Sequence, residues 1–191
     1  MQPSQFLKNF IRRPGETGAI VASSRGLADL ITRVAHLEGA GVVVELGSGA
    51  GAFTDTIARR IDPGATLLAV EINPEFVKAT RSRCSNVTVV HGSAADTDAH
   101  LKELGFDGCD RIICGLPWAS FSESRQDEIL EAVTSVLRPG GRFVTFAYHQ
   151  GLLLPGGRRF RKKLESCFSR VTTTRTVWLN VPPAFVYCAE Y

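Results

Sequence analysis

Short apolar runs alternate with longer amphipathic stretches from about residue 24 to residue 165 of this chain. The runs are rich in Val, Ile and Leu, as buried strands are, and the stretches between them have helical spacing. Five runs predict strands, at residues 42–46, 66–71, 87–91, 111–114 and 142–148. Strands that alternate with helices in this way predict a doubly wound α/β domain with a mostly parallel sheet.

The end of the chain has a different pattern. Two β-rich runs, residues 171–179 and 184–189, are separated by Asn-Val-Pro-Pro, which predicts an antiparallel hairpin that completes a seven-stranded sheet. Asn73 before Pro74 marks the start of one helix, and Leu-Arg-Pro-Gly-Gly at 137–141 marks the end of another. With no repeat or linker in the sequence, we expect a single domain over residues 1–191.

Charge adds a pattern that hydrophobicity does not show. The chain has 22 Lys and Arg against 19 Asp and Glu, yet residues 1–13 and 155–163 contain eight basic residues and no acid. These basic segments suggest an anionic partner, either a lipid surface or nucleic acid, although two solvated faces would look the same. No apolar run approaches the roughly 18 to 20 residues that span a bilayer, and we expect no signal peptide.

Five cysteines are scattered along the chain without any Cys-x-x-Cys pair: Cys84, Cys109, Cys114, Cys167 and Cys188. Their spacing does not suit zinc, and an odd number disfavours a disulfide framework. We therefore expect no metal site and reduced thiols, as in a cytosolic protein.

The strongest chemical signal is a glycine turn, Gly47-Ser48-Gly49-Ala50-Gly51, directly after the first predicted strand. Such glycines let a ligand approach the N-terminus of the next helix, and alone they would also fit a dinucleotide. Glu45 lies two residues before the turn, where it would repel a pyrophosphate but could hold an ammonium group, directly or through water. Glu71 ends the second strand, where a carboxylate can accept ribose hydroxyls.

These residues resemble the first motif of class I S-adenosylmethionine-dependent methyltransferases, in which an acid and any residue precede Gly-x-Gly-x-Gly. The resemblance implies a Rossmann-like fold and S-adenosylmethionine as cofactor. The cofactor contacts that it implies are Ser23, Ser24, Glu45, Gly47, Ser48, Gly49, Gly51, Glu71, Ile72, Gly92, Ser93 and Ala94.

Two parts of this set carry alternatives. Where the family often has an acid for the adenine amino group, this chain has Ser93; the backbone of Ala94 or Ala95, or Asp96, could serve instead, and Asp96 could equally cap the next helix. Residues 18–25 are expected to lie over the cofactor as a lid, with Ser23 or Ser24 capping the first helix.

Gly115-Leu116-Pro117-Trp118 follows the fourth strand, at the sheet edge where an acceptor would meet the methyl group. This turn offers backbone carbonyls and an aromatic face but no strong acid or base. In ribosomal RNA adenine dimethylases the corresponding motif, Asn-Leu-Pro-Tyr, begins with an acceptor for the adenine amine. Gly115 lacks that acceptor.

Nearly the whole chain resembles small bacterial phospholipid N-methyltransferases, most specifically at Gly-Leu-Pro-Trp and at Asn-x-Pro-Pro-Ala near residue 180. The resemblance implies up to three methyl transfers to the phosphatidylethanolamine headgroup, towards phosphatidylcholine. Two alternatives are an RNA adenine-N6 methyltransferase and a non-catalytic membrane-binding module that kept the fold.

Amine methylation needs alignment of a neutral nitrogen, and the accumulating positive charge suits aromatic faces. The predicted catalytic residues are Gly115, Leu116, Pro117, Trp118 and Tyr148. For Trp118 we favour a place in the site; for Phe121 and Tyr187, which lie near it in the predicted arrangement, we favour core packing. His149 could relay a proton, but we favour a surface position without function.

Residues 5–13 would form a short amphipathic helix, and residues 1–13 are expected to contact an anionic membrane, unless the helix simply packs on the domain. The residues expected at that membrane are Phe6, Leu7, Lys8, Phe10, Ile11, Arg12 and Arg13, with Arg158, Arg159, Arg161, Lys162 and Lys163. Residues 14–40 would then form the lid and first helix, and residues 41–191 the Rossmann-like core. We expect a cytoplasmic enzyme, peripheral on the inner face of the cell membrane, with a phospholipid substrate and neither nucleic acid nor an obligate protein partner.

Overall fold

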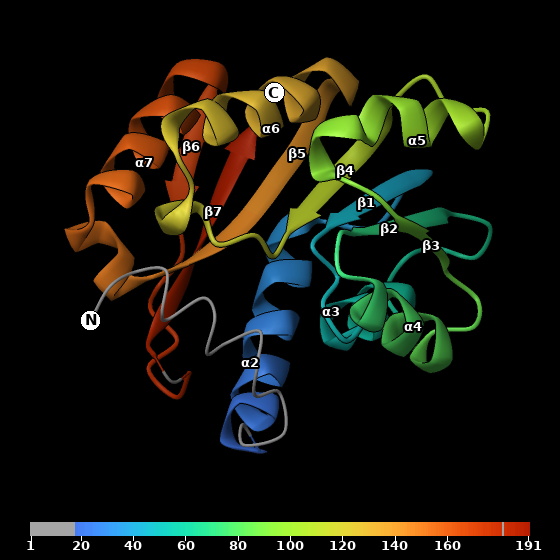
Figure 1. Ribbon diagram of the computed structural model, residues 1–191, viewed down its shortest axis with the longest axis horizontal. Helices are drawn as coiled ribbons and strands as arrows, with labels where there is room; N and C mark the ends of the chain where they lie inside the picture. The colour runs from blue at the N-terminus through green and yellow to red at the C-terminus, as the bar shows by residue number, and fades with distance from the viewer. Residues whose placement is uncertain (1–17, 181) are drawn as a thin grey trace.

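The computed structural model describes residues 18–180 and 182–191, with side chains from residue 26 onward (Figure 1). The predicted membrane-contact helix of residues 1–13 lies outside the described residues. Within the described ranges, no helix is long and apolar enough to cross a bilayer.

A seven-stranded sheet forms the middle layer, in the order β3-β2-β1-β4-β5-β7-β6. Strands β1 to β5 pair in parallel, while β7 lies antiparallel between β5 and β6. The strands are β1 Val42–Leu46, β2 Thr66–Glu71, β3 Thr88–His91, β4 Cys109–Cys114, β5 Leu137–Tyr148, β6 Arg170–Thr173 and β7 Ala184–Glu190. The predicted fold class, a doubly wound sheet with an antiparallel C-terminal pair, is confirmed.

Strands β1 and β2 have the predicted bounds, β3, β4 and β7 differ from the prediction by one or two residues, and β5 and β6 differ most. Strand β5 begins at Leu137 because that residue is already extended and pairs with Cys109 of β4, so the Pro-Gly-Gly stretch lies within the strand. Strand β6 ends at Thr173, well before residue 179. Beyond it Thr174 still bonds with Val186 of β7, and an isolated bridge joins Val177 to Ala184, but no regular strand continues.

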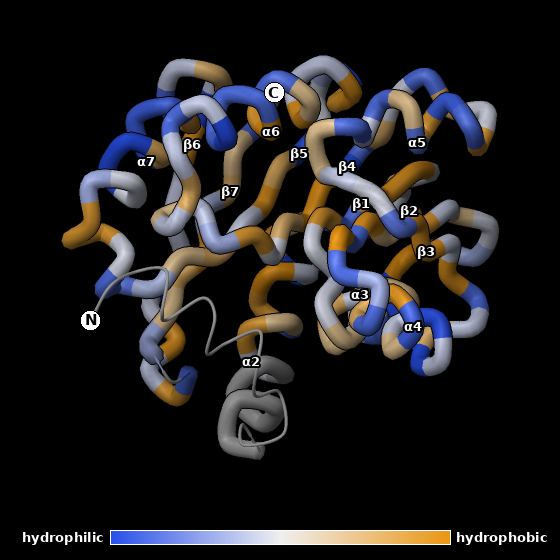
Figure 2. Tube along the Cα trace, viewed as in Figure 1, coloured by the Kyte–Doolittle hydropathy of each residue, from blue (hydrophilic) through white to orange (hydrophobic). Residues whose placement is uncertain are grey.

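Helices cover both faces of the sheet. They are α2 Gly18–Ala35, α3 Ala52–Ala58, α4 Pro74–Arg83, α5 Thr97–Glu103, α6 Glu123–Val136 and α7 Pro155–Cys167, with short 3-10 turns η1 Ala94–Asp96, η2 Trp118–Ser120 and η3 His149–Leu153. Helices α5, α6 and α7 lie on one face and α2, α3 and α4 on the other (Figure 1). The apolar residues gather between these layers, along the strands (Figure 2).

The helix starts show which local predictions were correct. Asn73 caps α4 as predicted, because its side chain accepts a hydrogen bond from the Glu75 amide and Pro74 takes the first helical position. The predicted cap at Ser23 or Ser24 is wrong. Helix α2 begins at Gly18, so both serines lie inside it, whereas a cap must precede the first turn.

Candidate active site

Three glycine turns meet at the carboxyl edge of the sheet, where a doubly wound fold binds its ligands. Each turn continues the hydrogen bonding of the strands. The Gly47 amide donates to the Val70 carbonyl at 2.8 Å, the Gly92 amide to the Glu71 carbonyl at 3.0 Å, and the Gly115 amide to the Leu46 carbonyl at 2.8 Å. The turns after β1, β3 and β4 therefore form one connected floor.

The turn after β1 needs its glycines. Gly47, Gly49 and Gly51 have φ angles of 77°, 54° and 82°, in the left-handed region that other residues rarely adopt. A Cβ at Gly51 would stand 3.2 Å from the Thr80 Cα, and the Thr80 hydroxyl donates to the Gly49 carbonyl at 2.7 Å. Helix α4 thus holds the turn from behind and leaves its open side to a ligand.

Glu71 is fixed between the glycine turn and α4. One of its carboxylate oxygens accepts from the Gly49 amide and the other from the Asn73 amide, both at 2.8 Å. Each oxygen keeps a lone pair for a further donor, such as a ribose hydroxyl. Ile72 follows directly and is 63% exposed, so an apolar surface lies beside the carboxylate.

One oxygen of Glu45 has no partner among the described residues. The side chain is 1% exposed, and its Oε2 accepts from the Thr54 hydroxyl at 2.5 Å, but its buried Oε1 accepts no hydrogen bond from the part of the chain that the structure describes. Burial raises the pKa of this carboxyl to about 7. The buried Ser48 hydroxyl in the turn likewise has no hydrogen-bond partner within residues 18–180 and 182–191. A bound ammonium group would supply a hydrogen-bond donor to Oε1 and a positive counter-charge to the Glu45 carboxylate.

In the turn after β3, the Ser93 oxygen is not free to accept a hydrogen bond from an adenine amino group. The Ser93 hydroxyl oxygen accepts from the Ala95 amide at 3.1 Å and from the Arg125 guanidinium at 3.0 Å. With both lone pairs used, Ser93 can offer an adenine only its O–H donor. Asp96 stands at the N-cap position of α5, but its side chain makes no capping hydrogen bond.

The turn after β4 packs directly on the turn after β1. A Cβ at Gly115 would stand 2.9 Å from the Gly47 carbonyl oxygen, and a Cβ at Gly47 would stand 2.8 Å from the Leu116 side chain. Glycine is therefore required at 115 by packing. Gly115, Leu116 and Pro117 are each half-buried at this edge.

Trp118 is a core residue, and its predicted place in the site is wrong. Its side chain is 3% exposed and stacks on Phe160 of α7 with ring centroids 4.2 Å apart. Its indole N–H donates to the Thr145 hydroxyl at 3.1 Å. Phe121 and Tyr187 pack in the same core, as predicted. The indole lies in the core because Phe160 of α7, 42 residues later in the chain, supplies its aromatic partner.

Tyr148 lies on the opposite face of the sheet from Trp118. It packs edge-on against Phe146, with ring centroids 5.5 Å apart, and Phe146 packs against Phe53 of α3 at 5.7 Å. This aromatic row, Phe53, Phe146 and Tyr148, was missed apart from Tyr148. The sequence contained a signal for it: Phe146 and Tyr148 are two residues apart in β5, and residues two apart share one face of a strand. Burial raises the pKa of the Tyr148 hydroxyl, which stays protonated.

Other candidate chemistry lies elsewhere. His149 is exposed, as predicted, and bonds Thr176. Burial raises the pKa of the Cys114 thiol to about 12, which makes it inert. Among the described residues no group of His, Cys, Asp and Glu could hold a metal ion.

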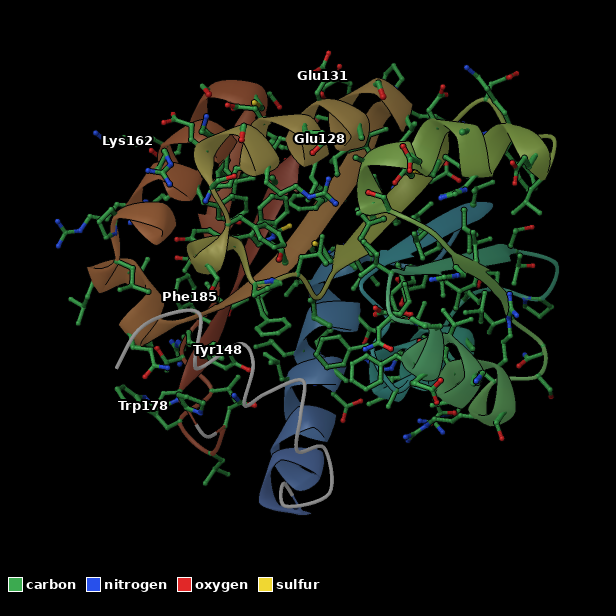
Figure 3. The ribbon with its side chains drawn as sticks, viewed as in Figure 1. Glu128, Glu131, Tyr148, Lys162, Trp178 and Phe185 are labelled. Carbon is green, nitrogen blue, oxygen red and sulfur yellow. The ribbon has the colours of Figure 1, made fainter. Side chains whose placement is uncertain are left out.

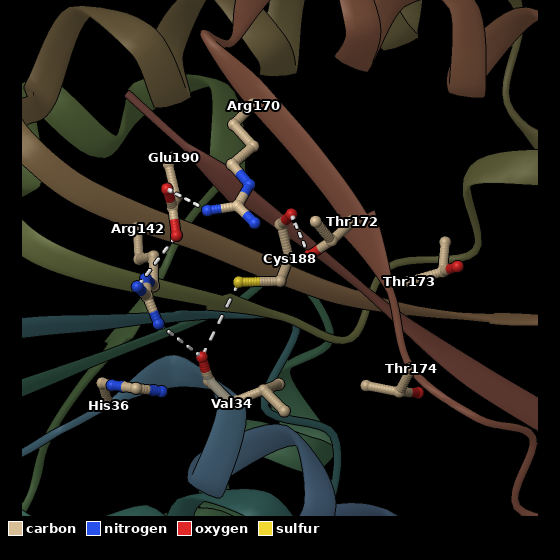
Figure 4. Close-up of a pocket in the computed structure, with 9 residues that line it drawn as sticks. All are labelled: Val34, His36, Arg142, Arg170, Thr172, Thr173, Thr174, Cys188 and Glu190. Carbon is tan, nitrogen blue, oxygen red and sulfur yellow. Dashed lines mark hydrogen bonds and ion pairs between the residues drawn. The ribbon is translucent and has the colours of Figure 1, made fainter.

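A groove of about 290 Å³ lies near the amino ends of the parallel strands, where Glu190 pairs with Arg142 and Arg170 (Figure 4).

Comparison with known proteins agrees with this geometry. The family described as "Methyltransferase domain" matches residues 43–141. An ornithine lipid N-methyltransferase from Singulisphaera acidiphila is 30% identical over 95% of this chain and 92% of its own length. This chain is a class I S-adenosylmethionine-dependent methyltransferase. S-adenosylmethionine is the cofactor, and the open oxygen of Glu45, the glycine turn and Glu71 suit its ammonium, methionyl and ribose parts.

Two further similarities have narrower weight. The methyltransferase superposes on an O-methyltransferase from Bacillus cereus in complex with SAH with a TM-score of 0.71, 17% identity, and coverage of 87% of this chain and 81% of that one. A probable ribosomal RNA small subunit methyltransferase A from Methanosarcina mazei is 30% identical, but over only 51% of this chain and 34% of its own. The first similarity shows the fold, and the second is confined to half of the methyltransferase.

Proposed function

We propose that this methyltransferase transfers methyl groups to the amine of a lipid headgroup, with phosphatidylethanolamine as substrate and phosphatidylcholine as final product. The similarity to an ornithine lipid N-methyltransferase carries the proposal, because it extends over 95% of the chain and so includes both the cofactor half and the acceptor half. Phosphatidylethanolamine and ornithine lipid both present an amine, which the acceptor edge of the sheet has to align.

The acceptor edge suits an amine that attacks with its own lone pair. Gly115, Leu116 and Pro117 place backbone and apolar atoms there, and no acid or base. Among the described residues no hydrogen bond engages the Gly115 carbonyl oxygen, which leaves it free to accept an N–H from the incoming amine. Alignment and exclusion of water are what such a displacement requires.

The aromatic row supports repeated methylation. After each of the first two transfers the product can lose its proton to solvent and attack again, whereas the third transfer leaves a quaternary ammonium with a permanent positive charge and no N–H to donate. Aromatic faces stabilise such a cation by about 0.5 to 2 kcal/mol. Tyr148, at the carboxyl end of β5, is the member of the row that ends the strand next to the acceptor turn (Figure 3).

Membrane contact is part of the same proposal. The amine of a membrane lipid reaches the enzyme at the bilayer surface, and we assign that contact to the basic, apolar residues 1–13 and to the basic residues 158–163. We place the enzyme on the inner face of the cell membrane, in the cytoplasm, without nucleic acid or an obligate protein partner.

The RNA adenine alternative has a specific obstacle. An asparagine at position 115 would supply the acceptor for an adenine amine, but its Cβ would collide with the Gly47 carbonyl oxygen. The similarity to a ribosomal RNA methyltransferase covers only half of this chain.

The test is methyl transfer from labelled S-adenosylmethionine to three acceptors in parallel: phosphatidylethanolamine vesicles, ornithine lipid vesicles and ribosomal RNA. We expect mono-, di- and trimethylated phosphatidylethanolamine on chromatography, and none with the Glu71→Gln variant. Label in ornithine lipid alone would correct the headgroup, and label in RNA alone would establish the adenine activity. If no acceptor is labelled and calorimetry detects no binding of S-adenosylhomocysteine, the chain is a non-catalytic module.

A further inference from the structure

The three most exposed large apolar side chains in the described part of the protein belong to two neighbouring loops. Leu153 ends η3 and is 73% exposed, while Trp178 and Leu179, in the connection between β6 and β7, are 74% and 89% exposed. We call these three residues the apolar rim. Figure 2 shows their loops at the left and lower left margins of the molecule.

Both loops leave the sheet at the acceptor edge. Tyr148, the last residue of β5, is paired with Ala184, the first residue of β7. The chain enters η3 directly after Tyr148, and the β6–β7 connection ends directly before Ala184. The apolar rim therefore stands next to the end of β5 that carries the predicted acceptor site.

The two loops are held to each other by His149. Its ring stacks on Trp178, with centroids 5.9 Å apart and an interplanar angle of 5°. Its Nε2 atom lies 2.7 Å from the Thr176 hydroxyl, and its amide donates to the Pro183 carbonyl at 3.2 Å. Trp178 is therefore held in an exposed position on an ordered support.

The two chain segments that carry the apolar rim are basic. Residues 146–164 and 170–189 contain seven basic residues and no acid. Part of that charge is neutralised, since Arg161 pairs with Glu165 within α7, Lys163 pairs with Glu123 and Asp127 of α6, and Arg170 pairs with Glu190 of β7. Arg158, Lys162 and Arg175 are exposed, and no salt bridge to them is found among the described residues. The exposed Glu128 and Glu131 of α6 lie at the opposite end of the molecule from Trp178 (Figure 3).

We propose that the apolar rim inserts into the surface of an anionic bilayer and so presents the acceptor edge to the headgroups. Tryptophan and leucine beside arginine and lysine are the combination that lies at a membrane–water interface, with apolar groups in the acyl boundary and cations at the lipid phosphates. The inference rests on the proposed lipid function and adds a contact separate from residues 1–13.

Intrinsic fluorescence tests the insertion of Trp178. The chain has two tryptophans, and Trp118 is 3% exposed, so a change on vesicle addition reports on Trp178. With vesicles of phosphatidylglycerol and phosphatidylcholine we expect a blue shift and quenching by brominated acyl chains. Neither should occur in the Trp178→Phe variant. Wild-type emission unchanged by saturating vesicles would overturn the proposal.

Vesicle sedimentation of the full chain tests the energetic contribution. Each truncation, Leu153→Ala, Trp178→Ala or Leu179→Ala, should weaken partitioning about 3- to 10-fold. The matched control is Leu104→Ala, an exposed leucine at the end of α5, which should bind within twofold of wild type.

The double variant Arg158→Gln with Lys162→Gln should lose affinity for anionic vesicles only, and that difference should vanish at high salt. Thermal unfolding confirms that each variant is folded.

Two results would overturn the proposal that the apolar rim inserts into a bilayer. One is wild-type sedimentation of the triple truncation. The other is a lipid-free dimer of the wild type that dissociates on truncation, which would make the rim an interface between copies. Methyl transfer to detergent-dispersed lipid separates this proposal from the function: if the truncated enzyme methylates dispersed lipid, loss of vesicle binding is a docking defect. A wild type that docks through the rim but methylates no lipid would refute the function alone.

Discussion

Glu45 makes the stability of the cofactor-free protein depend on pH. Its raised pKa of about 7, against an ordinary value of 4.5, means that the folded protein favours the neutral carboxylic acid. The unfolded chain therefore holds fewer protons than the folded one between these pH values. The free energy of unfolding that Glu45 contributes is full below about pH 4.5 and is lost as the pH rises through 7.

The Glu45→Gln variant should lose this dependence. Without cofactor it should be more stable than wild type at pH 8 by about 1 to 3 kcal/mol, and close to it at pH 5. It should also bind S-adenosylhomocysteine more weakly at pH 8, because the ammonium group loses its counter-charge. Urea unfolding and calorimetry at the two pH values measure both effects. Glu131→Gln, at an exposed acid of α6, is the control, and an equal stability difference at both pH values would contradict the argument.

Gly115 offers a second test at the residue scale. Gly115→Asn should not create an adenine methyltransferase, because the new Cβ forces the turn away from the Gly47 carbonyl. We expect a loss of about 1 to 3 kcal/mol in the free energy of unfolding and at least about tenfold weaker S-adenosylhomocysteine binding. Gly26→Asn should be nearly neutral, because a Cβ at Gly26 would meet no atom of another described segment within 4 Å. RNA methylation by the Gly115→Asn variant would refute this account.

At the scale of elements, the aromatic cluster around Trp118 joins η2, β5 and α7. Trp118→Phe removes the hydrogen bond to Thr145 and part of the ring, so the free energy of unfolding should fall by about 1 to 3 kcal/mol. The kcat/KM for methyl transfer should stay within about threefold, because the indole does not face the acceptor edge. Denaturant titration and a methyl-transfer assay decide the matter. A stable variant with a large catalytic defect would return Trp118 to the site.

The aromatic row makes a prediction about products. Tyr148→Leu keeps apolar volume but removes the aromatic face, so the first methyl transfer should persist while the third slows about 3- to 10-fold. The product mixture, resolved by chromatography, should then shift towards mono- and dimethylated lipid. Tyr148→Phe retains the ring and should give the wild-type mixture. Identical mixtures from all three proteins would show that the row does not stabilise the cation.

Across the whole molecule, the sequence predicts what depends on burial and short motifs. Strands β1 and β2 are buried on both faces, so their apolar runs stand out, and both match the prediction to the residue. Contacts between distant segments could not be predicted. The direction of Trp118 depends on Phe160, the Ser93 oxygen is filled by Arg125, and the length of β6 depends on where the chain leaves β7.

The three turns that continue the sheet also fix how rigid the floor of the site is. Because the amides of Gly47, Gly92 and Gly115 bond to neighbouring strands, we expect their hydrogen exchange to be as slow as that of the strand interior, measured by NMR without ligand. Gly64, in the exposed turn before β2, should exchange rapidly, and equally rapid exchange at all four would contradict this. A floor with such protection is preformed. Any closing of the enzyme over its ligands then has to come from elements outside the sheet.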